Sequence, residues 1–459
     1  MTIDTRTVGS PGWWMQKGAT RIREQYSRLD DLIRRANGDA RLPEGTNPAM
    51  SDAYCAFQSK ARANWADTIV RARDERIKLN GFSTAADADA DGDSVAQAMA
   101  KRARLYAELP DAVWFALVCA SGPMMIGRKD DRTVVTAEDP RQVAIFRDPA
   151  TNDIRAAIKV MSDQDIGKQY AYLMLDATEP DGPKSLWLHV ASRETRSRSF
   201  PVFSSAWDWD REPELLDLDR LPITELTSRR GVGVFELHTD LLDKINLQTL
   251  QGLVIAAMQA YKQRALINLP DVDDDGNTID WSGILTAGPG AVWNLPEGVE
   301  LKEFSEADIR GILEMSKDSR RELSDLTSTP LRASVADSAN QTAEGAQYAR
   351  EQLVFSIEDF LGLNDEPVAD AMALIAQWEG DDSRSDPSLI VPRWADPTRR
   401  SLAEMGDVDS KAQNTLPLKE RLVKIWGYSP SEADRVAAEK RAEQMESQAL
   451  GFIASNGSA

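Results

Sequence analysis

The chain has 459 residues, of which 42% are hydrophobic and 28% are charged. At about 100–200 residues per domain, this length predicts either several domains or one large elaborated fold with a sizeable core. Asp and Glu number 74 against 54 Lys and Arg, which gives a net charge of −20. This charge balance argues against a dedicated duplex-binding protein, which normally carries a basic face. It allows a protein that surrounds DNA without binding it tightly.

The chain is poor in the residues that build metal sites and nucleophilic active sites. It contains two cysteines, Cys55 and Cys119, and two histidines, His189 and His238. A disulfide framework, a cysteine-based zinc site and a histidine-rich metal site are therefore excluded. Neither histidine accompanies a serine or cysteine motif of nucleophilic catalysis. The sequence predicts neither an enzyme nor a bound cofactor.

The hydropathy pattern predicts neither a membrane-spanning helix nor a secretory signal. No stretch reaches the roughly 20 apolar residues that a membrane-spanning helix requires. The most apolar run, 112–126, is interrupted by Ser121, Gly122 and Pro123. The first residues lack the apolar segment of a secretory signal. We expect an intracellular, acidic α+β protein with no membrane partner.

The N-terminal part has helical periodicity. Apolar spacing predicts one helix around 21–35 and a second over about 50–79, with Gly81 just past its end as a C-terminal cap. The acidic string 87–93 imitates the first half of a calcium loop, but position 12 is Ala98 rather than a bidentate carboxylate. We expect this string to cap a helix that begins near Ser94.

The segment 113–209 has the pattern of a mostly antiparallel sheet module. Its short β-branched or aromatic runs alternate with Asp, Asn, Gly and Pro turns; the runs are 114–118, 134–136, 143–146, 154–160, 170–175 and 186–190. Gly122 and Gly127 have the spacing of a phosphate loop, but no Lys-Ser/Thr pair follows directly. A strand–turn–strand is therefore expected there.

Two long helices flank a shorter β-containing segment. Apolar residues at helical spacing predict a helix over 236–264, about 43 Å long at 1.5 Å per residue. Short strands are expected around 265–269, 291–294 and 299–304, and a second long helix over 305–329, beginning with a capping-box-like Ser305 to Asp308. The acidic string 271–275 also lacks the twelfth calcium ligand and predicts a hairpin turn.

The remaining chain is predicted to be mainly helical. The small polar residues 331–341 predict a mobile loop, followed by a helix from about Thr342 to Gly362. Pro367 is expected to interrupt that helix before a further one reaches Trp378. A short strand over 388–394 and a helical tail complete the chain.

The order of these features resembles that of the portal proteins of tailed, double-stranded DNA bacteriophages. The features within 221–394 are Pro222 and Ile223, the helix containing 240–246, the turn with Pro289, Gly290 and Trp293, the stop 327–330, and the restart 340–344. Segments 75–82, 146–148 and 391–397 also fit. Their order and spacing, more than any single motif, make the resemblance specific.

The resemblance implies a structural protein without catalysis. Members form a closed ring, usually of twelve subunits, at one capsid vertex, and DNA passes through the ring's channel during packaging and ejection. The implied partners are other copies of the chain, double-stranded DNA bound without sequence preference, the large terminase, the head-to-tail adaptor, the major capsid protein and a scaffolding protein. The implied location is the virion, and the host cytoplasm during assembly.

The resemblance also implies a division of the chain into subdomains. In chain order they are a wing (1–235), a first stem helix (236–264), an α/β clip (265–304), a second stem helix (305–329), a tunnel loop (330–342), a tunnel helix with a return to the wing (343–394), and a helical crown (395–459). This makes the expected fold class α+β with the portal arrangement.

Candidate functional residues follow from this division. The tunnel-loop candidates are Arg332, Ser334, Asp337, Ser338, Asn340 and Gln341. The basic stem candidates are Lys244, Lys262, Arg264, Lys317, Arg320 and Arg321, for each of which a solvated face or an inter-subunit salt bridge is the alternative. The clip candidates for terminase or adaptor contact are Asp273, Asp275, Trp281 and Trp293.

Two other functions stay open at this point. One is an acidic enzyme of unrecognised type that holds a divalent metal with the strings 87–93 or 271–275, although both lack the twelfth carboxylate. The other is a different capsid-associated component, such as an adaptor or scaffold. The two long helices around a 40-residue β-containing segment argue against that second alternative.

Overall fold

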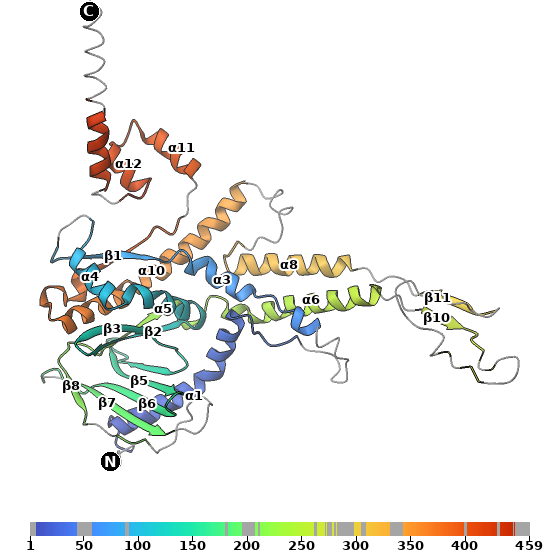
Figure 1. The fold of residues 1–459 in the computed structure, drawn as a ribbon, viewed down its shortest axis with the longest axis horizontal. Helices are drawn as coiled ribbons and strands as arrows, with labels where there is room; N and C mark the ends of the chain where they lie inside the picture. The colour runs from blue at the N-terminus through green and yellow to red at the C-terminus, as the bar shows by residue number, and fades with distance from the viewer. Residues whose placement is uncertain are drawn as a thin grey trace, which may run out of the picture.

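The structure is a computed structural model and gives a large body, a two-helix stalk and a separate group of C-terminal helices (Figure 1). The residues that it describes are 6–43, 57–87, 91–179, 182–194, 207–209, 212–260, 264–270, 272, 278–279, 281, 298–303, 309–330, 343–398, 402–428, 432–443 and 445. Helices and antiparallel strands both contribute to the core, which confirms the α+β class.

The predicted antiparallel module consists of two sheets. The larger sheet has the order β4-β5-β6-β7-β8, formed by β4 (Val143–Arg147), β5 (Ile154–Asp163), β6 (Lys168–Asp176), β7 (Leu186–Glu194) and β8 (Glu214–Leu216). The smaller sheet has the order β3-β2-β9, formed by β2 (Ser121–Lys129), β3 (Arg132–Ala137) and β9 (Ile223–Thr227). Every pairing in both sheets is antiparallel. Gly122 and Gly127 both lie within β2, and the turn of the expected strand–turn–strand follows at Asp130 and Asp131, before β3.

Helix α1 (Pro11–Ala36) packs across the five-stranded sheet. Ser10 caps its first turn by accepting a hydrogen bond from the Trp13 amide, and Pro11 occupies the first helical position. A Cβ atom on Gly18 would lie 2.1 Å from Cδ1 of Ile158, so only glycine lets the helix approach the sheet this closely. Beside this contact, the Trp14 and Phe146 rings pack with centroids 5.2 Å apart.

The centre of the body is a layer of helices on the three-stranded sheet. It contains α5 (Leu105–Cys119) and α10 (Ala343–Glu379), with α3 (Trp65–Asp74) and α4 (Ser94–Arg102) beside them. Asn364 of α10 is fully buried. Its Nδ2 donates to the Thr227 carbonyl at 3.0 Å, and its Oδ1 accepts from the Thr227 amide at 2.8 Å, which continues the hydrogen bonding of β9.

A two-stranded antiparallel sheet joins distant parts of the chain. It pairs β1 (Leu79–Thr84) with β12 (Ile390–Trp394), which confirms the strand expected over 388–394. Short 3-10 turns lie at η1 (Arg229–Gly231), η3 (Asp382–Arg384) and η4 (Pro387–Leu389). The helical tail includes α11 (Leu402–Ala412) and α12 (Leu418–Lys424), whose packing is tied by an Arg421–Asp409 ion pair of 2.8 Å.

The structure corrects three sequence expectations and confirms a fourth. Residues 114–118 belong to α5 rather than to a strand, because the burial that favours Trp, Phe and Val in strands is supplied here by helix packing. The helix expected over about 50–79 is not continuous: residues 61–64 are not helical, α3 ends at Asp74, and Gly81 is a strand residue of β1 and not a helix cap. Helix α10 continues through Pro367, where buried neighbours on both sides keep the helix intact. Asp93 caps α4 as predicted, accepting from the Val95 and Ala96 amides.

Among the described residues, no helix combines the length and the apolar character that crossing a membrane requires.

Candidate functional site

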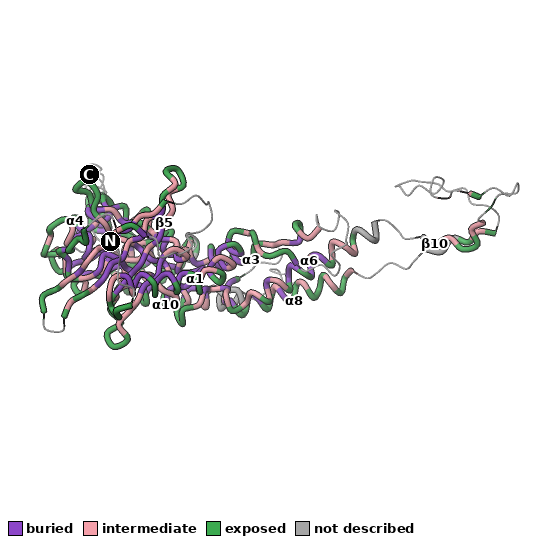
Figure 2. The backbone as a smooth tube through the Cα atoms, turned by 90° about the horizontal axis from the view of Figure 1, so that it is seen from below, coloured by how far each residue is buried: buried purple, intermediate pink, exposed green. Residues whose placement is uncertain are grey.

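The feature that stands out from the body is a stalk of two adjacent helices. It is formed by α6 (Thr239–Ala260), which follows the 3-10 turn η2 (Glu236–His238), and by α8 (Arg310–Leu326). Figures 1 and 2 show the pair projecting from the body, with the antiparallel strands β10 (Arg264–Ile267) and β11 (Glu300–Glu303) beyond its far end. Most buried residues lie in the body, and the stalk is largely half-buried or exposed.

The stalk differs from the predicted helices at its boundaries. The helix expected over 236–264 ends at Ala260, and Arg264 is the first residue of β10, paired with Glu303. Arg264 therefore lies on a strand and not on a stem helix. The strands expected around 265–269 and 299–304 are confirmed as β10 and β11, which pair antiparallel.

The two stalk helices are held together by a narrow buried seam. Gln248 of α6 donates a 3.1 Å hydrogen bond to the Ser319 hydroxyl of α8, and both side chains are buried. Ile245 and Leu250 of α6 and Leu323 of α8 are also buried. Outside this seam, Lys244 and Glu322 form a half-exposed ion pair of 3.6 Å.

The root of α6 is fixed to α1. The Arg35 guanidinium contacts both carboxylate oxygens of Asp243, at 2.6 and 3.0 Å, and also contacts Asp31 at 2.7 Å. Arg35 is only 6% exposed, and its hydrogen bond to Asp243 is the main reason that its pKa is raised. One turn further along α6, Asn246 accepts a 3.0 Å hydrogen bond from the Ala63 amide.

The end of α8 is fixed to α3 by a second buried arginine. Arg73 donates to the Thr327 carbonyl at 2.6 Å and to the Thr329 hydroxyl at 2.9 Å, and Thr327 caps the end of α8. A cation at a helix C-terminus is favourable because the helix dipole is negative there. Burial lowers the pKa of Arg73 to about 10, so the guanidinium is still charged at neutral pH.

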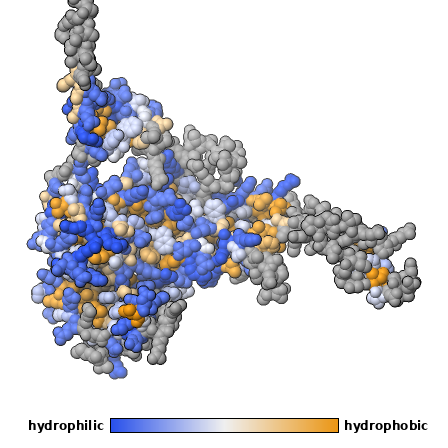
Figure 3. Space-filling view, viewed as in Figure 1, coloured by the Kyte–Doolittle hydropathy of each residue, from blue (hydrophilic) through white to orange (hydrophobic). Residues whose placement is uncertain are grey.

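Part of the stalk surface is apolar. Helix α6 has no charged residue from Ile245 to Ala260, and the consecutive residues Leu253, Val254 and Ile255 are each partly exposed. On α8, Leu313 is 51% and Met315 46% exposed. Figure 3 shows apolar side chains gathered on the stalk. Leu253, Val254 and Ile255 point to different sides of α6, so its apolar surface is not confined to the side that faces α8.

The basic stem candidates have mixed environments. Lys244 forms the ion pair with Glu322 within the same chain, and Arg320 donates from Nε to the Ser316 carbonyl at 3.1 Å. Arg321 lies 3.5 Å from Asp318, and Lys317 is exposed on α8. Lys262 lies outside the described residues.

Most loop and clip candidates also lie outside the described residues. These are the tunnel-loop residues Arg332, Ser334, Asp337, Ser338, Asn340 and Gln341, and the clip residues Asp273, Asp275 and Trp293. Trp281 is described, and its indole nitrogen donates to the Pro270 carbonyl at 2.7 Å. The predicted strand at 291–294 and the capping box at 305–308 are not described either.

Of the two acidic strings in the metal-enzyme alternative, residues 88–90, 271 and 273–275 lie outside the described residues. Within the described residues, no group of three or more His, Cys, Asp or Glu side chains is arranged to hold a metal ion. Asp93 is the last acid of the string 87–93. Its carboxylate caps α4, accepts a hydrogen bond from the Thr84 hydroxyl and pairs with Arg384 at 2.6 Å. Burial raises the pKa of the Cys119 thiol to about 12, which keeps it from being a nucleophilic thiolate.

Sequence reasoning missed the residues that position the stalk. Arg35, Arg73 and Asn246 were not candidates, because each acts on a residue about 180–260 positions away. Their only local signal is an arginine or asparagine on the otherwise buried side of a helix. Such a residue is expected to have a buried polar partner.

Solved structures contain chains that are similar to this one. No protein-family model and no curated protein sequence matches the chain. A chain in the solved structure described as "Neck of empty GTA particle computed with C6 symmetry" is similar, with 12% sequence identity and a TM-score of 0.47. The match covers 86% of this chain and 98% of that chain. Since a likeness of this degree supports no functional argument, the assignment depends on this chain's own residues.

Proposed function

We propose that this chain is the subunit of a portal, a closed ring at one capsid vertex through which double-stranded DNA is packaged and later ejected. The proposal combines the portal-like order of sequence features with the stalk described above. In it, α6 and α8 are the stem, β10 and β11 belong to the clip, α10 contains the tunnel helix, and the C-terminal helices are the crown. Terminase and later the adaptor dock at the clip, and the chain has no catalytic activity of its own.

The main support is the surface of α6 between Gln251 and Ala256. Successive residues of a helix point about 100° apart, so Leu253, Val254 and Ile255 together face more than half of its circumference. Helix α8 covers only one side of α6, and all three side chains keep partial exposure in the single chain. A second surface must cover the remaining sides, and copies of the same stalk arranged around an axis provide it.

A ring also accounts for the asymmetry of the stalk. Its apolar α6 and its charged, amphipathic α8 are different surfaces, so contact between neighbouring copies joins unlike faces. Unlike faces form heterologous interfaces, which close into a ring when the rotation between subunits is suitable. The buried anchors at Arg35 and Arg73 hold both stalk helices at a fixed angle to the body, as repeated identical contacts require.

The charge of the chain suits a channel through which DNA slides. Twelve copies at −20 each would carry about −240, and a wall of that sign repels phosphate. Tight binding would instead require many Lys and Arg contacts that release counterions. The basic residues Lys317, Arg320 and Arg321 on the stem, with Arg332 on the loop, are our candidates for transient contact with DNA.

The proposal is tested by placing a charge on α6 and measuring the mass of the assembly. Leu253→Asp should abolish ring formation, because a carboxylate would be buried without a partner between neighbouring stalks. The matched control is Ile166→Asp, which puts the same charge at an apolar residue that is 58% exposed on the turn between β5 and β6. Sedimentation analysis should find rings for the control and not for Leu253→Asp; rings from both variants would contradict the proposed packing.

A further inference from the structure

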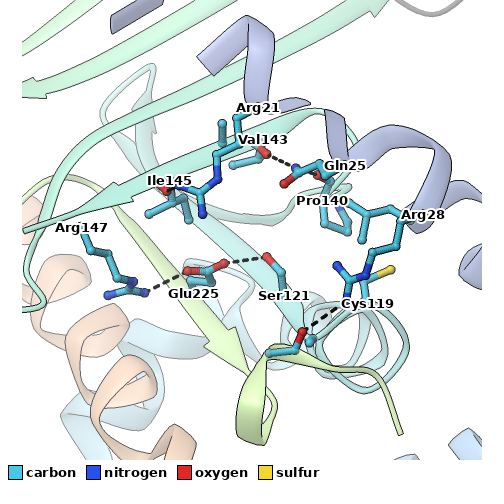
Figure 4. Close-up of a pocket in the computed structure, with 14 residues that line it drawn as sticks. Arg21, Gln25, Arg28, Cys119, Ser121, Pro140, Val143, Ile145, Arg147 and Glu225 are labelled. Atoms are coloured by element: carbon cyan, nitrogen blue, oxygen red, sulfur yellow. Dashed lines mark hydrogen bonds and ion pairs between the residues drawn. The ribbon is translucent and has the colours of Figure 1, made fainter. Parts of the chain in front are cut away.

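A cavity unrelated to the stalk lies between α1 and the two sheets. Its volume is about 390 Å³, and its walls come from α1, from β4 and the residues before it, from the α5–β2 turn, from β9 and from η1 (Figure 4). The charged residues that line it are Arg21, Arg28, Arg147 and Glu225. Three guanidinium groups and one carboxylate give the lining a charge of +2, within a chain whose net charge is −20.

The single carboxylate in the lining is already neutralised by its neighbours. Arg147 contacts Oε2 of Glu225 at 3.0 Å, and the Ser121 hydroxyl donates to Oε1 at 2.6 Å (Figure 4). Arg147 also donates to the Asn152 carbonyl at 3.2 Å. This group therefore forms one wall of the cavity, and Glu225 compensates neither Arg21 nor Arg28, whose counter-ion is Glu236.

Arg28 is held at the edge of the cavity by a partner outside the lining. Its Nε lies 2.5 Å from Glu236 Oε1, and its Nη2 lies 2.6 Å from Glu236 Oε2. Nη2 also donates to the Gly231 carbonyl at 3.2 Å. Its third nitrogen, Nη1, donates to no group within the described part of the chain, so one N–H edge of a fixed guanidinium is available to a ligand.

Arg21 has no counter-charge among the residues that the structure describes. Its Nη1 donates to the Ile145 carbonyl at 3.0 Å, and its guanidinium carbon lies 5.2 Å from the centre of the Phe146 ring. These contacts hold the side chain but do not neutralise it, and no carboxylate among the described residues pairs with it. Figure 4 shows Arg21 entering the cavity from α1, on the side opposite Ser121 and Glu225.

We propose that this cavity binds a small oxyanion of the phosphate or sulfate class, held by Arg21 and by the Nη1 edge of Arg28. Guanidinium groups suit such anions because their N–H donors match the geometry of two oxygen atoms. The volume of the cavity suits a small molecule and excludes a DNA duplex. The inference is independent of the proposed ring, since none of these residues belongs to the stalk helices.

The test is calorimetric titration of the full-length protein with inorganic phosphate, in chloride buffer at constant ionic strength. Arg21→Gln should weaken binding about tenfold or more, the effect expected from losing a charge-assisted pair of hydrogen bonds. The matched control is Arg23→Gln, on the exposed side of the same helix and outside the cavity lining, which should change affinity less than about twofold. Glu225→Gln should strengthen binding, because it removes the only carboxylate from the lining.

The outcomes separate the proposal from a general charge effect. No heat of binding in the wild type, or equal losses for Arg21→Gln and Arg23→Gln, would overturn it. Adenosine 5′-monophosphate is the second probe; tighter binding of it than of inorganic phosphate would identify a phosphomonoester as the ligand, and the reverse would identify the free anion. Thermal unfolding in chloride alone checks that each variant folds, and the mass of the assembly reports on the ring separately.

Discussion

Arg35 of α1 and Asp243 of α6 form a two-contact ion pair, with nitrogen–oxygen distances of 2.6 and 3.0 Å. Arg35 is almost fully buried, whereas the Asp243 side chain is 45% exposed. The pair joins the last turn of the N-terminal helix to the first turns of the stalk. It therefore fixes the direction in which α6 leaves the body.

Replacing the acid of this pair should loosen the stalk root. Asp243→Asn should lower the free energy of unfolding by about 1–3 kcal/mol, because a buried guanidinium loses one of its two charged partners and keeps only Asp31. Asp240→Asn, an exposed change one turn earlier on the helix, should stay within about 0.5 kcal/mol. Urea unfolding measures both; equal effects would show that the ion pair does not anchor the stalk.

The Arg73 anchor should be visible in hydrogen exchange. Arg73→Met leaves the Thr327 carbonyl and the Thr329 hydroxyl without this donor and should cost about 1–3 kcal/mol of stability. Backbone amides at the end of α8 should exchange faster, since local opening there becomes easier. Arg71→Met, which removes an exposed arginine from the same helix, provides the comparison and should leave that exchange unchanged.

Gly18 should tolerate no side chain at the α1–sheet contact. Gly18→Ala should destabilise the protein by about 1–3 kcal/mol, because the new methyl group overlaps Ile158. That loss should outweigh the gain of roughly 1 kcal/mol that alanine brings to a helix interior. Gly362→Ala in α10, where no atom lies within 4 Å of the added Cβ, should be neutral or stabilising in the same thermal unfolding assay.

Asp93 should make part of the folding stability depend on pH. Burial alone would raise its pKa, but hydrogen bonds from Arg384 and Thr84 lower it below the ordinary value of 3.8. A carboxyl whose pKa is lowered in the folded state stabilises the protein above its unfolded pKa, and this contribution disappears as the pH falls through the folded pKa. Asp93→Asn should therefore lower the stability at neutral pH. It should also make the further decrease in stability below about pH 4 smaller than in the wild type. An unchanged pH profile would contradict this role for Asp93.

The strands and long helices were predictable because their signals are local. Alternating apolar residues and Asp, Asn or Gly turns identify β5, β6 and β7, and apolar spacing identifies α6 and α8. Asp93 followed by Ser94 has the composition of a helix start, and the structure confirms that cap. In each case the residues that form the element also contain the information about it.

The features that the sequence did not predict depend on distant partners. β1 pairs with β12 across about 300 residues, and no local pattern reveals that Gly81 lies opposite Arg393. Helix α10 continues through Pro367 because neighbouring elements bury Val368 and form hydrogen bonds with Asn364. The cavity at Arg21 likewise combines residues from α1, β4 and β9, which become neighbours only after folding.

The central claim, assembly into a ring through the stalk, is tested most directly by the mass of the purified protein in solution, together with negative-stain electron microscopy. The account predicts a closed ring with a central hole; twelve copies of 50.8 kDa give about 610 kDa. A homogeneous 50.8 kDa monomer at every protein concentration, with and without the scaffolding protein, would contradict it.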